Sequence, residues 1–65
     1  MATLVKTYEN GGAFARIFFH RDTDDYVVRF YSRDYSYMEG EDFVTPSYTA
    51  ALDAAVIGVN RIDES

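Results

Sequence analysis

Hydrophobic and polar residues alternate along the first half of the chain and change to a helical period in the second half. Residues 3–8, 13–21 and 26–33 are rich in β-branched and aromatic side chains, which predicts three strands. Residues 10–12 (Asn-Gly-Gly) and the polar run 22–25 separate these strands. Both separators are typical of tight hairpin turns, because Asn, Asp and Gly tolerate turn backbone conformations. The first half is therefore predicted to form an antiparallel meander.

The second half changes its period at Thr45-Pro46. We expect Thr45 to cap a helix of about four turns that runs to residue 62, with Pro46 at its first position. Its buried stripe is expected to be Tyr48, Leu52, Ala55, Val56, Val59 and Ile62. Residues 35–44 fit either a short hairpin or a loop. The predicted fold class is α+β, a three- to four-stranded antiparallel β-meander followed by one C-terminal helix packed on one sheet face.

A single helix covers one face of such a sheet and leaves the other face open to solvent. Side chains alternate between the faces, and arginine is rarely buried without a partner, so Arg16 and Arg29 indicate which positions point outwards. The outer face is then expected to carry Phe14, Arg16, Phe18, His20, Arg29, Tyr31 and Arg33, with Tyr35 and Tyr37 near its edge.

Aromatic residues and arginine are enriched at protein interfaces, which makes the outer face a candidate binding surface. The expected partner-binding residues are Arg16, Phe18, Arg29, Tyr31, Arg33 and Tyr35. The same pattern also arises without a partner, when tyrosines fit a pleated surface and arginine stems cover neighbouring rings. Under the binding interpretation, Tyr31→Ala and Arg33→Ala weaken partner binding and leave the fold intact.

Length and composition restrict the classes of protein to which this chain can belong. A chain of 65 residues is expected to form a single domain, residues 1–65, and the absence of cysteine excludes disulfides and thiolate metal sites. The net charge of −5 counts against a generic nucleic-acid binder, since phosphate contacts need an excess of Lys and Arg. A second candidate patch is acidic and consists of Asp22, Asp24, Asp25, Glu39, Glu41 and Asp42. This patch is an alternative contact surface, complementary to a basic region of a nucleic-acid enzyme.

Catalytic and metal-binding motifs are not matched. The run 22–25 begins like a calcium loop, but Val27 replaces the glycine of the sixth position and Arg33 the glutamate of the twelfth. The chain has one histidine, no cysteine and no glycine-flanked nucleophilic serine. Its acidic residues fall in turns, where they stay solvated. The sequence therefore predicts a protein that is not an enzyme and needs no cofactor.

Two other functions remain open beside protein binding. An aromatic and arginine-rich sheet face suits single-stranded nucleic acid, although the glycine-rich aromatic signature of RNA-recognition sheets is missing. A homo-oligomeric structural module is the second, with contact through Ala50, Ala54 and Ile57 on the back of the helix. The chain shows neither a basic and apolar leader nor a run of about 20 apolar residues, so we expect a cytoplasmic protein without a membrane partner.

The segments DTDDYVVRFY (22–31) and GEDFVTPSYTAALDAAV (40–56) resemble short proteins of tailed bacteriophages, including cyanophages. The resemblance covers about half of the chain and includes no catalytic motif. It implies a small accessory protein, made during infection in the cytoplasm of the host, that binds and modulates a host enzyme. The size and the strands-plus-helix build are also similar to a phage inhibitor of bacterial RNA polymerase, which is an analogy at the level of the fold.

Overall fold

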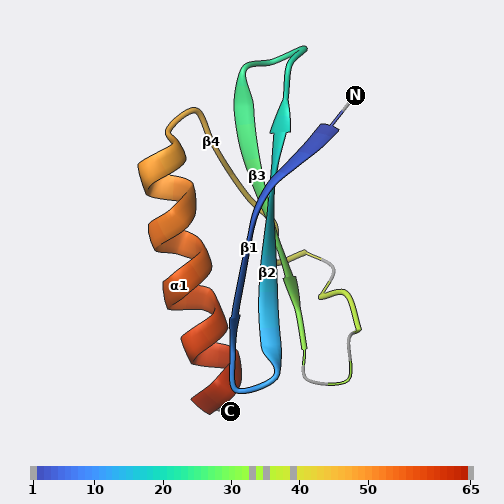
Figure 1. Ribbon diagram of the computed structural model, residues 1–65, viewed down its shortest axis with the longest axis vertical. Helices are drawn as coiled ribbons and strands as arrows, with labels where there is room; N and C mark the ends of the chain where they lie inside the picture. Colours follow the sequence, from blue (N-terminus) through green and yellow to red (C-terminus); the bar gives the residue numbers. More distant parts are fainter. Residues whose placement is uncertain (1, 33, 35, 39, 65) are drawn as a thin grey trace.

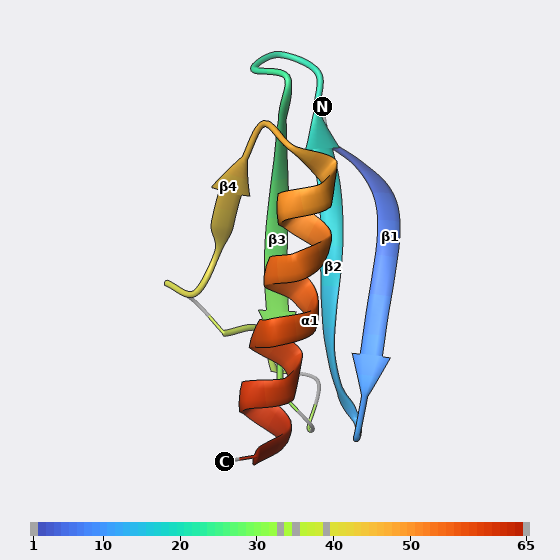
Figure 2. The same cartoon turned by 90° about the vertical axis from the view of Figure 1, so that its left-hand side faces the viewer.

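The computed structural model describes residues 2–32, 34, 36–38 and 40–64. It contains four strands and a helix: β1 (Ala2–Asn10), β2 (Ala13–His20), β3 (Asp25–Tyr31), β4 (Phe43–Thr45) and α1 (Tyr48–Glu64). The strands pair antiparallel in the order β1-β2-β3-β4. Helix α1 covers one face of this sheet, as Figures 1 and 2 show. The predicted α+β meander with one C-terminal helix is thus confirmed.

The β1–β2 hairpin closes through Gly11 and Gly12, whose φ angles are 64° and 92°. Positive φ at both central residues is the geometry of a type I′ turn, which matches the twist of the flanking strands. Pairing therefore continues down to Asn10 and Ala13, and β1 is longer than the predicted 3–8. Near the other end of β1 the register shifts between Leu4 and Lys6, which leaves Val5 as a bulge.

Strand β3 ends at Tyr31, and β2 at His20, each earlier than the sequence pattern predicted. After β3 the chain turns, and the backbone N–H of Ser32 donates to the carbonyl of Ser36 at 3.0 Å. Tyr37 then forms an isolated bridge with Tyr31, and the N–H of Met38 donates to the carbonyl of Phe30 at 2.9 Å. The chain leaves this edge of the sheet and returns to it.

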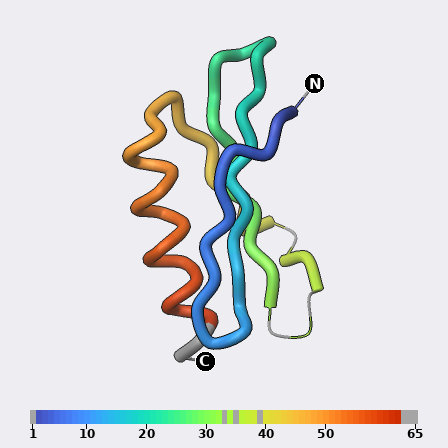
Figure 3. Tube along the Cα trace, viewed as in Figure 1, coloured from blue at the N-terminus to red at the C-terminus, as the bar shows by residue number. Residues whose placement is uncertain are grey.

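After the bridge at Tyr37, the chain pairs with β3 a second time through strand β4. Phe43, Val44 and Thr45 pair with β3, and the path from β3 through the intervening loop can be followed in Figure 3. The segment 35–44, for which the sequence allowed either a hairpin or a loop, therefore includes a bridge and the start of an edge strand.

Helix α1 begins later than predicted. Its N-cap is Ser47, whose hydroxyl accepts from the N–H of Ala50 at 3.3 Å. Thr45 belongs to β4 instead, and its hydroxyl accepts from the N–H of Ser47 at 3.2 Å. The prediction of Thr45 as cap and Pro46 as first helical residue was wrong, because Thr45 extends the sheet by pairing with Tyr26.

The core lies between α1 and the inner face of the sheet. The sheet contributes Ala15, Ile17, Val28 and Phe30, and the helix contributes Ala51, Ala55 and Val59. Small alanines at the centre of the contact let the helix approach the sheet closely. The predicted stripe missed Ala51, which is fully buried, and included Tyr48, which is exposed; Leu52, Val56 and Ile62 are half-buried at its margins.

Gly58 of α1 packs directly against the ring of Phe30. A Cβ atom at this position would lie 2.2 Å from Cε1 and 2.6 Å from Cζ of that ring. Real Cβ atoms do not approach carbon so closely, so glycine is required for this packing. A second link joins the helix to β1, where Asn10 donates to the side-chain oxygen of Asn60 at 2.9 Å.

Candidate functional site

The sheet face opposite α1, here called the outer face, carries its side chains in cross-strand rows. Leu4 lies opposite Phe18, Phe18 opposite Val27, and Val27 opposite Val44, so that one apolar row crosses all four strands. Residues that face each other across antiparallel strands project from the same side of the sheet. Leu4 is 50% exposed and Val44 is 57% exposed, while Phe18 and Val27 are half-buried.

The next row contains two arginines that lie directly opposite each other, Arg16 on β2 and Arg29 on β3. Like charges in such a pair repel each other. Each guanidinium is held over aromatic rings: that of Arg16 lies 5.3 Å from the Phe14 ring and 5.2 Å from the Tyr31 ring. That of Arg29 lies 5.4 Å from the Phe18 ring. Cation–π contacts of this kind offset part of the repulsion.

Arg29 also approaches an acidic residue. Its Nε lies 3.9 Å from a carboxylate oxygen of Asp42, and this buried N–H has no hydrogen-bond partner among the described residues. The Tyr37 hydroxyl donates to both oxygens of Asp42, at 2.6 and 2.7 Å. This hydrogen bond to the Asp42 carboxylate raises the pKa of Tyr37, because it stabilises the protonated phenol.

An aromatic row follows the arginines. The rings of Phe14 and Tyr31 stack with centroids 4.6 Å apart and planes 7° from parallel, and Tyr37 lies 5.6 Å from Tyr31. The register places Phe14 on the outer face, as predicted, but the ring is not exposed there: Phe14 is only 7% accessible. The expectation of an exposed Phe14 was wrong, because alternation fixes the face and not what covers it.

The structure gathers four of the predicted partner-binding residues, namely Arg16, Phe18, Arg29 and Tyr31, into one cluster. Arg33 and Tyr35 lie outside the described residues. Sequence reasoning missed the contribution of Leu4 and Val44 to this face. In β1 the bulge at Val5 interrupts the alternation of inward and outward side chains, so the sequence pattern does not identify Leu4 as an outer residue. Val44 can be assigned to the outer face only once β4 is known to pair with β3.

The predicted acidic residues occupy separate places. Asp22 and Asp24 lie in the β2–β3 turn, and Asp25 begins β3 opposite His20. Glu41 and Asp42 precede β4 instead, and Glu39 lies outside the described residues. Asp42 is engaged with Arg29 and Tyr37, so it belongs to the outer-face cluster.

Asp34, in the loop after β3, is held by its neighbours. Its carboxylate accepts from the Ser32 hydroxyl and from the N–H of Ser36. The hydrogen bond from Ser32 is the main reason why the pKa of Asp34 lies below its usual range. This carboxylate shapes the loop, because both of its donors are loop residues.

The back of α1 exposes less apolar surface than predicted. Ile57 is 56% exposed, but Ala50 and Ala54 are half-buried. Asp53 and Arg61, each four residues from Ile57 along the helix, are also exposed. A single isoleucine among charged side chains is ordinary for a protein surface.

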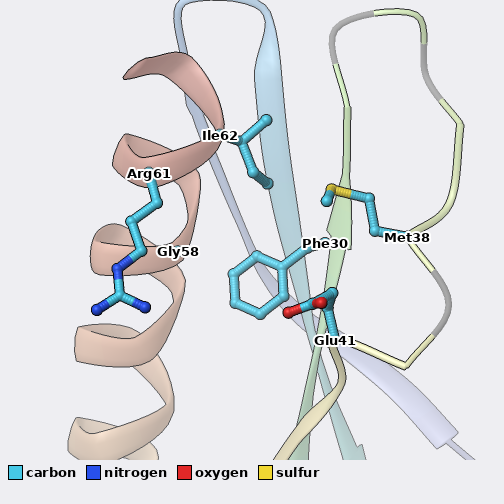
Figure 4. Close-up of a pocket in the computed structure, with 6 residues that line it drawn as sticks. All are labelled: Phe30, Met38, Glu41, Gly58, Arg61 and Ile62. Carbon is cyan, nitrogen blue, oxygen red and sulfur yellow. The ribbon is translucent and has the colours of Figure 1, made fainter. Parts of the chain in front are cut away.

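A shallow groove of about 260 Å³ lies between the C-terminal half of α1 and the return of the chain towards β4. Its lining consists of Phe30, Met38, Glu41, Gly58, Arg61 and Ile62, which Figure 4 shows around the Phe30 ring. Phe30 and Gly58 are packed against each other in the core, so the floor of this groove is structural.

Among the described residues, no three histidine or acidic side chains are close enough to hold a metal ion. No helix in that part of the chain is both long and apolar enough for a membrane span. Comparisons with protein-family models, with curated proteins and with solved structures give no match to this chain.

Proposed function

We propose that this chain is a small, non-enzymatic protein-binding domain that docks its partner on the outer face of the sheet. The observation that carries the proposal is the apolar row Leu4–Phe18–Val27–Val44, which crosses the whole open face and is flanked by Arg16 and Arg29. A contiguous apolar strip beside aromatic rings and guanidinium groups combines the residue types that dominate binding hot spots.

The arrangement of the rings favours a protein over single-stranded nucleic acid. Base stacking requires an accessible ring face, but Phe14 and Tyr31 stack on each other and Arg16 lies over both. The net charge of −5 and the carboxylate of Asp42 beside Arg29 oppose a phosphate backbone. The exposed ends of the apolar row, Leu4 and Val44, suit an apolar protein surface instead.

The resemblance to short proteins of tailed bacteriophages makes a host enzyme one class of partner for this surface. In that setting the outer face binds and modulates the enzyme without chemistry of its own. The apolar row provides the contact area, and the two arginines select for carboxylates on the partner, because guanidinium groups bind carboxylates in a defined geometry.

Capture experiments with surface variants test this proposal. The double variant Leu4→Ser/Val44→Ser removes the exposed ends of the row, and Ile57→Ser is the matched control, because Ile57 is similarly exposed but lies on the helix. Tagged wild-type and variant proteins are incubated with bacterial lysate, with and without nuclease treatment, and the retained proteins are identified by mass spectrometry.

We expect a protein that the wild type and Ile57→Ser retain and the double variant loses. Retention that survives in the double variant, or is lost equally in Ile57→Ser, would refute docking on the outer face. Loss of all captured material on nuclease treatment would indicate nucleic acid as the true ligand.

A further inference from the structure

On β3 the outer face carries opposite charges on the two sides of its apolar row. On β3, Asp25 and Arg29 lie two residues on either side of Val27. All three project from the outer face, because their partners on β2 are outer residues. Asp25 pairs with His20, Val27 with Phe18, and Arg29 with Arg16. From Asp25 to Arg29 the outer positions of β3 therefore read acid, apolar, base, and Tyr31 follows them. Such a sequence is complementary to itself when two copies meet in opposite directions.

We propose that a second copy of this chain packs its outer face on the first, around a two-fold axis that runs along the apolar row. This inference rests on the proposed function, since it assigns the occupant of the same docking surface. The axis brings Val27 against Val27 of the second copy and Arg29 against Asp25 of the second copy. Because the contact is isologous, the Arg29–Asp25 pair forms twice.

The geometry agrees with the way in which sheets pack. Two sheets that meet face to face keep their strand directions within about 30° of each other, which a two-fold axis across the strands allows. Helix α1 lies on the opposite face of each sheet (Figure 1), so both helices would stay on the outside of the dimer. The apolar rows meet at the centre, where Leu4 and Val44 are removed from water.

The charges around the row favour this occupant. The Arg29 side chain is 44% exposed, and its described acidic neighbour, Asp42, remains 3.9 Å away. A guanidinium has five N–H donors, so it can bind Asp25 of the second copy in addition. On β2 the same axis places Arg16 opposite His20 of the second copy. The contact thus adds two opposite-charge pairs to a chain whose net charge of −5 otherwise opposes association.

Charge exchange gives a test that does not depend on knowing another partner. Arg29→Asp places two acids opposite each other in the dimer, and Asp25→Arg places two bases opposite each other. In an equimolar mixture of the two variants both contacts are again between opposite charges. Sedimentation velocity is measured from ~10 µM to ~500 µM, the range in which small interfaces associate.

We expect the wild type to dimerise in this range and each variant to dimerise at least ~10-fold more weakly, because each loses two pairs. The mixture is expected to recover the dimer as a heterodimer. Leu4→Ser/Val44→Ser is expected to be monomeric and Ile57→Ser to remain dimeric. Far-UV circular dichroism shows whether each variant is folded. If Arg29→Asp does not fold, the dimerisation of Asp25→Arg and of the serine variants tests the proposed contact.

A wild type that stays monomeric throughout overturns the inference, as does a mixture that sediments like its separate components although both variants fold. Dimerisation lost in Ile57→Ser and kept in Leu4→Ser/Val44→Ser overturns it in favour of a helix contact. A monomer that still captures another protein through Leu4 and Val44 overturns only the second copy as occupant. A monomer that captures nothing refutes the proposed function as well.

Discussion

Gly58→Ala is the most direct test of the packing between helix and sheet. In an ordinary helix interior this substitution stabilises by about 1 kcal/mol, because alanine has the higher helix propensity. Here the new Cβ would lie 2.2 Å from Cε1, 2.6 Å from Cζ and 3.0 Å from Cδ1 of Phe30. Phe30 is a core residue, so moving its ring away from the new Cβ would disturb its packing in the core.

Overpacking a well-filled core costs about 1–3 kcal/mol. Subtracting the gain in propensity, we expect Gly58→Ala to lower the free energy of unfolding by up to about 2 kcal/mol. In a domain of this size each 1 kcal/mol lowers Tm by about 4–8 °C. Urea denaturation followed by circular dichroism gives the free energy, and thermal unfolding gives Tm.

Phe30→Leu provides the matched background, because leucine lacks the two ring atoms that approach position 58 most closely. In that background Gly58→Ala is expected to be neutral or stabilising, and the double-mutant cycle to give a coupling energy of about 1–3 kcal/mol, which is the overpacking cost that leucine relieves. Ile57→Ala, at the exposed neighbouring position, is expected to change stability by less than about 0.5 kcal/mol. A Gly58→Ala variant more stable than the wild type, with no coupling to position 30, would refute the reasoning.

Two further predictions concern local interactions. Ser47→Ala removes the hydroxyl that accepts from the N–H of Ala50 and is expected to cost about 1 kcal/mol in urea denaturation. Thr23→Ala, at an exposed position of the β2–β3 turn, is the control, and equal stability of both variants contradicts the cap. The pKa of Tyr37 is raised above its ordinary value of 10.0 by Asp42, so this hydrogen bond stabilises the fold below pH 10 and is lost as pH rises through the pKa of the folded state. In a ¹³C-tyrosine NMR titration, Asp42→Asn is expected to shift the ionisation of Tyr37 towards lower pH, and an unchanged midpoint contradicts this assignment.

The strand pattern was predictable because its determinants are local. The Asn-Gly-Gly turn and the β-branched and aromatic runs specify neighbouring antiparallel strands without long-range information. The same holds for the face assignment of β2 and β3, where Arg16 and Arg29 identify the outer positions. Strand β4 was not predictable in this way, because three residues carry no periodicity and their strand conformation depends on pairing with β3.

The errors within elements have tertiary causes. Hydrophobic periodicity gives most weight to large side chains, but the helix meets the sheet through Ala51 and Ala55. From the sequence alone, a glycine at position 58 is expected only to weaken the helix. The structure shows that its missing side chain makes room for the ring of Phe30. The apolar row of the outer face was likewise hidden, since its two ends depend on a bulge in β1 and on the position of β4.

The outer face serves stability as well as binding, and this changes which variants report on function. Tyr31 stacks on Phe14, lies under Arg16 and contacts Tyr37, so Tyr31→Ala removes packing that the fold itself uses. The sequence suggested this substitution as a probe of binding alone, but a stacked pair contributes about 0.5–1.5 kcal/mol beyond its buried area. Loss of binding in Tyr31→Ala therefore does not separate contact from stability. Leu4 and Val44 make that separation, because their side chains are exposed and lie in the same surface.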